Sequence, residues 1–290
     1  MKRYKVRHYT QYTYPEPVLL FPHLLRVRPR EGVDLRIISS ELTVFPKANL
    51  FWFRDVESNS VASASFFCKT NVLSVNSEVL VEKYDAQPFD FLVEDYAVDF
   101  PFIYQTDELV CLRPYMSGYK LAKSDLVQAF VDEFWVYGDH IQTFTLLFEI
   151  NQYIHQNFVY IKRDEEGVQS PEQTLYFRSG SCRDFAYLYM TVVKQLGFAS
   201  RFVSGYICSD YLNGAAGATH AWVEVFIPGV GWKGFDPTQG TLTGFEHIPV
   251  AVARCPRLVP PVSGQFYGAG ISAMAVSVFV SEVLPTVRLD

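Results

Sequence analysis

The sequence predicts an α+β protein in which a β-rich, sandwich-like domain precedes a domain of helices and strands. Two observations carry this prediction. The first third of the chain consists of short segments with alternating apolar and polar residues, rich in aromatic and β-branched side chains, which is typical of strands. Later segments repeat apolar residues every three to four positions, which is typical of helices.

The expected strands come first along the chain. They are YKVRHYTQYTY, HLLRVRPR, LRIISSELTVF, LFWFRDV, SVASASFFCKTNVLSV and SEVLVEKYD, separated by turn-forming residues. Between 84 and 118, proline and acidic residues interrupt short aromatic clusters and no period holds. We therefore expect a β-rich domain at 1–100, a linker at 101–123, and a core at 124–290 that includes C-terminal strands.

The core is expected to open with helices. Ser124 precedes DLVQAFVDEFW, TFTLLFEINQYIHQNF follows, and Ser170 with Pro171 is a typical helix start. A further helix is expected after Cys182, where the apolar residues lie at offsets of 0, 3, 4, 7, 8 and 11 from Phe185. Gly197 supplies its end.

Composition limits the function. With 49% apolar and 19% charged residues in 290, the chain is an ordered globular protein. The net charge of -6 and scattered basic residues do not indicate nucleic acid as a partner. No apolar run approaches the ~18 residues of a membrane span, and no signal-peptide pattern opens the chain. We expect a cytoplasmic protein without a membrane partner.

Five cysteines stand at 68, 111, 182, 208 and 255, without a C-x-x-C pair. The irregular spacing argues against a disulfide framework or a zinc knuckle and favours free thiols. Cys182 would lie in the first turn of its helix, where free N–H groups and the helix dipole stabilise a thiolate and can hold an oxyanion. The alternative is a packed, inert thiol, since cysteine is often buried. Among the others, only Cys255, before a proline, is expected to be exposed.

A thiol nucleophile needs a base, and the base needs an orienting group. THAWVEVFIPGVGWKGFDPTQG reads as a β-hairpin in which residue 227 would face 231 and 221 would face 237. His220 and Asp236 would then share one face, directly opposite or one diagonal apart. A carboxylate at that distance can accept the imidazole N–H and favour the imidazolium.

Three blocks carry a resemblance to the transglutaminase-like superfamily: GSCRDFAYLYMTVVKQLGFASRFVSGYI, THAWVEVFIPGVGWKGFDPTQG, and YKVRHYTQYTYPEPV with LLRVRPR. They resemble its bacterial branch of cysteine proteases with a β-rich N-terminal domain. The resemblance implies a papain-like core with Cys182 as nucleophile, His220 as general base and acid, and Asp236 as orienting carboxylate. It implies acyl transfer on a peptide or amide bond through a thioester, and hydrolysis is favoured over cross-linking because water needs no second site.

No cofactor or metal is required by this chemistry, and the expected partner is a peptide or protein substrate. Two alternatives stay open: a catalytically silent module that binds peptides or proteins, and a zinc site built from Cys182, His220 and Asp236. Trp222 and Trp232 are candidates for the walls of the acyl site or for core packing. Tyr160 and Asn157 are candidates for the second oxyanion donor. The sequence does not predict the oligomeric state.

The chain departs from the family's pattern at two places. The N-terminal domain of the family tends to have Asp followed shortly by Gly-Asn, whereas this chain has Asp55 and Asn59 without the glycine, so that turn is expected to differ. Near the end the branch tends to have Arg-Asp-Tyr, and this chain has Arg254-Cys255-Pro256-Arg257. A substrate preference inferred from relatives is therefore unsafe.

Overall fold

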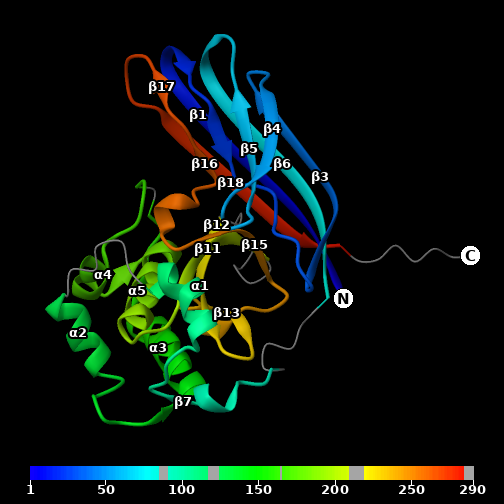
Figure 1. Ribbon diagram of the computed structural model, residues 1–290. Coiled ribbons are helices and arrows are strands. Elements are labelled where there is room, and N and C mark those ends of the chain that lie inside the picture. The colour runs from blue at the N-terminus through cyan, green and yellow to red at the C-terminus, as the bar shows by residue number, and fades with distance from the viewer. Residues whose placement is uncertain (85–90, 117–123, 164, 209–218, 284–290) are drawn as a thin grey trace, which may run out of the picture.

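The protein is described by a computed structural model over residues 1–84, 91–116, 124–163, 165–208 and 219–283. Figure 1 shows a β-sandwich that lies above a helical core with its own sheet. The expected α+β fold is confirmed. Within these residues, the helices are too short or too polar to span a membrane.

Two sheets form the sandwich. The first contains β17 (Phe266–Tyr267), β1 (Lys2–Leu20), β6 (Lys69–Lys83) and β3 (Leu35–Phe45), and β18 (Ala273–Glu282) also pairs with β1. The second contains β16 (Val262–Ser263), β2 (His23–Leu25), β5 (Ser60–Ser65) and β4 (Asn49–Arg54). Inward-facing residues such as Val18, Leu25, Ala62 and Leu73 are fully buried between the sheets, as the alternating pattern of their strands requires.

The core contains a five-stranded sheet and most of the helices. In order across the sheet lie β14 (Thr241–Leu242), β13 (Gly231–Asp236), β12 (Thr219–Ile227), β11 (Ser200–Ile207) and β15 (His247–Ala253). The helices are α1 (Thr106–Met116), α2 (Asp125–Asp132), α3 (Thr143–Asn157), α4 (Pro171–Phe177) and α5 (Cys182–Gln195). Smaller elements are η1 (Asp95–Ala97), η3 (Pro256–Leu258) and the strand pairs β7 (Asp99–Phe100) with β8 (Ile141–Gln142) and β9 (Val159–Tyr160) with β10 (Ser179–Gly180).

The C-terminal strands differ from the expected domain organisation. We expected them within the core at 124–290, but β16, β17 and β18 pair with β2 and β1 of the sandwich. β18 pairs antiparallel with β1 from Tyr4 to Thr13 and buries Val278 and Val280. Alternation in the sequence identifies a strand but not its partner, which here lies more than 250 residues away.

The expected linker at 101–123 is also different where the structure describes it. Residues 106–116 form α1, and residues 117–123 lie outside the described residues. Leu112 of α1 is buried together with Tyr104 and Ala199. Pro114 lies inside the helix. Proline is disfavoured in the interior of a helix, so the sequence did not indicate a helix here.

The core sheet is covered by helices on one face and in part by the sandwich on the other. One face packs against α5, and Ala221, Val223 and Val225 of β12 join Phe185 and Tyr189 of α5 in a large apolar cluster. Part of the other face contacts the sandwich through a second cluster, which contains Tyr206, Cys208, Ile248 and Val250 of the core and Tyr4, Val6, Val79 and Val81 of the sandwich. The two domains therefore share a hydrophobic core.

A buried amide joins the domains at β15. The Asn59 side chain, which is 0% exposed, donates through Nδ2 to the Val252 carbonyl at 2.9 Å and accepts at Oδ1 from the Val252 N–H at 2.9 Å. The Arg30 N–H also donates to the Pro249 carbonyl at 2.8 Å. These bonds extend the hydrogen bonding of β15 on its outer edge into the sandwich.

Candidate active site

Cys182 is the first residue of α5, directly after the N-cap Ser181. Its side chain lies at the edge of the apolar cluster, and the residue is 7% exposed. Gly180 precedes it at a crowded position, because a Cβ there would lie 2.8 Å from Cβ of Asp184. Cys182 therefore lies in the first turn of α5, as the sequence predicts, where a helix has N–H groups without partners inside the helix.

Asp184 organises this first turn, and our sequence analysis did not identify it. Its carboxylate accepts from the Ser181 N–H and Oγ–H at 2.8 Å each, from Nη1 of Arg163 at 2.8 and 2.9 Å, and from the Gln169 N–H at 2.7 Å. Burial acts to raise the pKa of Asp184, but these donors prevail and lower it. The Ser-x-x-Asp spacing before an apolar run was a usable signal, because it resembles a capping box.

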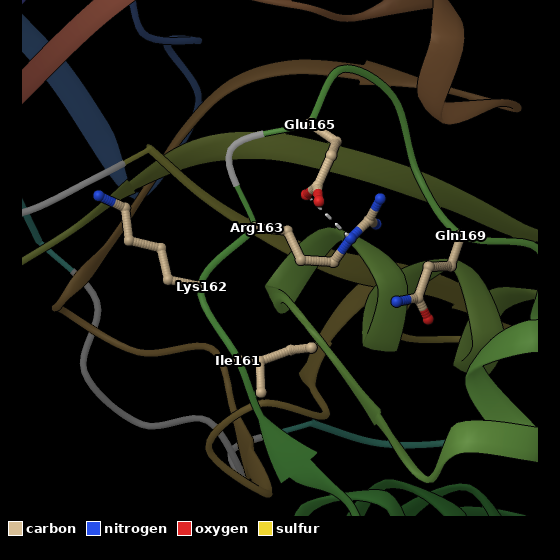
Figure 2. Close-up of a pocket in the computed structure, with 5 residues that line it drawn as sticks. All are labelled: Ile161, Lys162, Arg163, Glu165 and Gln169. Atoms are coloured by element: carbon tan, nitrogen blue, oxygen red, sulfur yellow. Dashed lines mark ion pairs between the residues drawn. The ribbon is translucent and has the colours of Figure 1, made fainter.

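Residues Arg163 and Gln169 belong to a loop that lines an open depression of about 630 Å³ beside this turn. Figure 2 shows its lining residues Ile161, Lys162, Arg163, Glu165 and Gln169. The Ile161 N–H donates to the Gly180 carbonyl at 2.9 Å. The loop is thereby tied to residues on both sides of Cys182, through the Gly180 carbonyl and the Asp184 carboxylate.

The hairpin β12–β13 has the register that the sequence predicts. Ile227 pairs with Gly231 and Val223 pairs with Phe235, which confirms the expected pairing of 227 with 231. Continuing this register, Trp222 stands opposite Asp236 and His220 lies one diagonal away. The Nε2 atom of His220 and Oδ2 of Asp236 are 2.6 Å apart.

The Cys182 side chain lies close enough to the His220 ring to act on its pKa. Since Nε2 faces Asp236, Nδ1 is the nitrogen available to the thiol. Burial acts to lower the pKa of His220, but the charge and hydrogen bond of Asp236 and the neighbouring Cys182 prevail and raise it well above the ordinary value. The site therefore favours the imidazolium form of His220.

Asp236 is fully buried and has further donors. Its Oδ1 accepts from the Thr238 N–H at 2.9 Å and the Gln239 N–H at 3.3 Å, and its Oδ2 accepts from Nε2 of His247 at 3.0 Å. Burial acts to raise the pKa of Asp236, but His220 and then His247 lower it far below the ordinary value. Our sequence analysis did not identify His247, because β15 adjoins β11 and nothing local in the sequence relates it to Asp236.

The tryptophans that we considered as walls separate in the structure. Trp222 is buried and its ring lies 6.1 Å from the His220 ring and 5.2 Å from the His247 ring, centroid to centroid. The ring occupies the space where Gly205 would otherwise carry a Cβ. Trp232 instead packs against Tyr115 and Phe226 and under the Arg201 guanidinium. Only Trp222 contacts the rings of this site.

The two candidates for the oxyanion donor also differ. Tyr160 on β9 lies close enough to Cys182 for the thiolate charge to act on it; burial first, and then that charge, raise the pKa of Tyr160 to about 12. The side-chain amide of Asn157 donates to the Tyr153 carbonyl at 2.9 Å in its own helix. Tyr160 is therefore the better placed of the two.

The exposure of the other thiols differs from the expectation. We expected only Cys255 to be exposed besides Cys182, but Cys68 and Cys111 are exposed and Cys255 is half-buried. Cys208 is buried at the end of β11, as expected for a core strand. Cys68 lies in the turn between β5 and β6 and Cys111 on the exposed side of α1, and an apolar sequence context alone does not determine exposure at such positions.

The turn at Asp55 keeps a left-handed residue although it lacks glycine. Ser58, immediately before Asn59, has φ +61°, and Oδ1 of Asp55 accepts from the Glu57 and Asn59 N–H groups at 3.0 and 2.9 Å. These bonds hold Ser58 in a conformation that is otherwise costly for a residue with a Cβ. At the second departure, the Arg254 carbonyl accepts from Nζ of Lys194 at 3.0 Å.

A zinc site does not fit this geometry well. Among the described residues, the compact set of possible ligand atoms is His220, Asp236 and His247, within 4.8 Å of one another, and it does not include Cys182. Two ligands at the usual 2.0–2.1 Å from a tetrahedral zinc lie about 3.3 Å apart. The 2.6 Å contact between His220 and Asp236 is instead the length of a charge-assisted hydrogen bond.

A thiol at the start of a helix, packed on an antiparallel sheet whose neighbouring strands carry the histidine and the carboxylate, defines an α+β protein with a papain-like core. Residues 4–82 match the Bacterial transglutaminase-like N-terminal region, and residues 138–237 match the Transglutaminase-like superfamily. The chain thus carries a transglutaminase-like core, preceded by a bacterial transglutaminase-like N-terminal region.

Several proteins are similar to this chain over most of its length. The "Uncharacterized protein Rv2569c" of Mycobacterium tuberculosis is 26% identical, covering 91% of this chain and 88% of its own length. The "Uncharacterized protein ML0607" of Mycobacterium leprae is 23% identical and covers 98% and 100%. The crystal structure of a "Putative Cysteine Protease" from Cytophaga hutchinsonii shares the fold with a TM-score of 0.74 at 18% identity, covering 98% of this chain and 91% of that one.

Proposed function

We propose that the protein is a cysteine-dependent acyl-transfer enzyme that hydrolyses a peptide or amide bond, with Cys182, His220 and Asp236 as its catalytic residues. The observation that carries the proposal is the position of His220, whose Nε2 lies 2.6 Å from Oδ2 of Asp236 and whose ring is close enough to Cys182 for the thiol to act on its pKa. Such a chain of thiol, imidazole and carboxylate generates a thiolate and an imidazolium at neutral pH.

The proposed reaction has two stages. The Cys182 thiolate attacks the carbonyl carbon, and the oxyanion that forms is held by N–H groups of the first turn of α5. The carbonyl re-forms as the C–N bond breaks, and the His220 imidazolium protonates the departing amine. A water molecule then loses a proton to His220 as it attacks the thioester, which releases the carboxylic acid and the thiolate.

The proposed substrate is a peptide or protein, because a thiolate paired with an imidazolium suits attack on an amide carbonyl. The depression lined by Lys162, Glu165 and Gln169 does not include Cys182 in its lining, so the proposal does not rest on it. Hydrolysis is proposed over cross-linking because water requires no second binding site. The family name alone does not distinguish the two acceptors.

The first test is the alkylation of each cysteine by iodoacetamide between pH 5 and 9, resolved by mass spectrometry. An ordinary thiol with a pKa of about 8.5 is less than about 1% ionised at pH 6. We expect Cys182 to react at least about tenfold faster at pH 6 than an ordinary thiol. Cys68 and Cys111, which are exposed, provide the reference in the same sample.

His220→Ala is the decisive variant. We expect it to remove the reactivity of Cys182 at pH 6 and to leave that of Cys68 and Cys111 unchanged. If Cys182 of the wild type reacts no faster than the two reference thiols, the catalytic proposal fails. The catalytically silent binding module would then be the better account of this site.

A further inference from the structure

His247 is a second histidine on the Asp236 carboxylate, and the proposed chemistry does not use it. Its Nε2 lies 3.0 Å from Oδ2 of Asp236, the same oxygen that is 2.6 Å from Nε2 of His220. The His247 side chain is 1% exposed and the Asp236 side chain 0%. A buried polar group in contact with a functional carboxylate requires an explanation.

Nε2 of His247 carries a hydrogen whether the ring is neutral or charged. Oδ2 of an ionised carboxylate only accepts hydrogen bonds, so Nε2 must donate. On the other side of the ring, the Gly244 N–H donates to Nδ1 at 3.2 Å, and Oε1 of Glu246 lies 3.1 Å from Nδ1. Whether Nδ1 accepts from Gly244 or donates to Glu246, the donor toward Asp236 is unchanged.

The surroundings hold the His247 ring in one orientation. The edge of the ring meets Trp222 at an interplanar angle of 79°, and the His247 backbone begins β15 opposite Ile207. β15 in turn is bonded to the sandwich through Asn59 and Arg30. The ring is therefore held by its contact with Trp222 of the core sheet. Its strand is held by hydrogen bonds to the N-terminal domain.

The carboxylate needs this support. The last torsion of an aspartate side chain, between a tetrahedral and a planar carbon, has broad energy wells, so it does not itself fix the carboxylate plane. Here the plane is set by the Thr238 and Gln239 N–H groups on Oδ1 and by the two imidazoles on Oδ2. Without His247, His220 would be the only described residue that holds Oδ2.

We propose that His247 is a positioning residue, whose Nε2–H fixes Oδ2 of Asp236 in the orientation that holds the His220 ring against the Cys182 thiol. This inference rests on the proposed function. His247 acts through Asp236 and touches neither the thiol nor the reacting bond in this account. The N-terminal domain contributes to the site indirectly, because it anchors the strand that carries His247.

A matched pair of variants tests the donor. The side-chain nitrogen of glutamine reaches the position of the histidine Nε2, whereas the shorter asparagine reaches only that of Nδ1. His247→Gln therefore keeps a donor toward Asp236 and His247→Asn removes it, while both stay polar. The readout is the pH profile of Cys182 alkylation by iodoacetamide, with urea unfolding to verify that both variants fold.

We expect His247→Asn to slow alkylation of Cys182 at pH 6 about tenfold, the low end of the roughly 10–100-fold loss that follows when the hydrogen-bond partner behind a metal-binding side chain is removed. His247→Gln should stay within about twofold of the wild type. The downfield proton resonance of the His220 Nε2–H should be retained in the Gln variant and shifted in the Asn variant. A residue that only packs would change stability without changing the pH profile or this resonance.

The outcomes separate this inference from the proposed function. If His220→Ala removes the low-pH reactivity but His247→Asn keeps the wild-type profile, the positioning role is wrong and the catalytic proposal stands. If Gln and Asn are equally slow, ring shape and not the donor matters, and the inference is likewise wrong. If His220→Ala has no effect, the proposed function fails. Should His247→Asn not fold, a wild-type profile in His247→Gln still supports the donor role and a slow one contradicts it.

Discussion

Two carboxylates near the site have 0% exposure: Asp184 in the first turn of α5 and Asp236 at the end of β13. Their partners differ in one respect. Asp184 is paired with the Arg163 guanidinium and with N–H and O–H donors. Asp236 is paired with two imidazoles and with backbone N–H groups. Both carboxylates therefore have their acceptor sites filled.

The difference lies in what the partners can do with a proton. A guanidinium stays charged at every accessible pH, so Asp184 can hold the backbone around Cys182 but cannot take part in proton transfer. An imidazole gains and loses a proton near neutral pH, so Asp236 can stabilise a charge that comes and goes. The comparison teaches that a buried carboxylate gains a chemical role from the titratability of its partner and not from its burial.

The largest effect is expected for Asp184→Asn. It leaves the guanidinium of Arg163, whose side chain is 15% exposed, without its buried counter-charge. Breaking such a pair on one side costs about 3–5 kcal/mol, which urea unfolding at pH 7 would measure. The control is Glu165→Gln, because Glu165 faces the same guanidinium at 3.5 Å but is 71% exposed; it should cost under about 1 kcal/mol.

The cost of Asp184→Asn should depend on pH. The pKa of Asp184 is lower in the folded protein, so its contribution is complete above the unfolded value of about 3.9 and is lost as pH falls through the folded value. The difference between wild type and variant should therefore shrink below about pH 4. A difference that stays constant down to pH 2 would show that the charge of Asp184 is not what stabilises the turn.

A smaller effect, on reactivity, is expected for Asp236→Asn. Without the carboxylate charge the pKa of His220 should fall by one to two units, so Cys182 alkylation at pH 6 should slow about ten- to hundredfold, or roughly 1.4–2.7 kcal/mol. An unchanged profile would mean that Asp236 is as purely structural as Asp184.

The loss of stability caused by the same variant should also depend on pH. The pKa of His220 is raised in the folded protein, so its contribution is complete below the unfolded value of about 6.5 and is lost as pH rises through the folded value. The pKa of Asp236 is lowered, so its contribution is lost toward acid pH. The destabilisation by Asp236→Asn, measured by urea unfolding, should therefore be largest between about pH 4 and 6.5.

The smallest effect is expected for Ser181→Ala. It removes the Oγ–H bond to Oδ2 of Asp184 but keeps the Ser181 N–H bond to the same oxygen. A loss of about 1 kcal/mol is expected from urea unfolding. A loss as large as that of Asp184→Asn would mean that the serine, and not the guanidinium, is the main partner of Asp184.

The sequence was informative where neighbours in space are also neighbours along the chain. The period of three to four residues after Cys182 and the two-residue period of the hairpin determine which faces meet. They sufficed to predict α5, the register of β12 with β13, and the contact of His220 with Asp236. Both patterns are local, so a single sequence contains them.

Partners that are distant along the chain could not be predicted in this way. Arg163 reaches Asp184 from a loop without a period, and His247 reaches Asp236 from a strand on the far side of β11. The pairing of β18 with β1 is another case. In each case the local sequence determines an element or a charge, but the contact depends on tertiary packing that no short pattern records.

The return of β18 to β1 has a consequence for the order in which the molecule is made. The core between residues 138 and 237 matches a family unit of its own, and it is enclosed by the two parts of one sandwich. During synthesis β1 cannot complete its pairing with β18 until the ribosome has passed residue 282. Until then β1 exposes an unpaired edge, which is a site for wrong pairing with other chains. β1, which emerges before every other described strand, is thus among the last of them to complete its sheet.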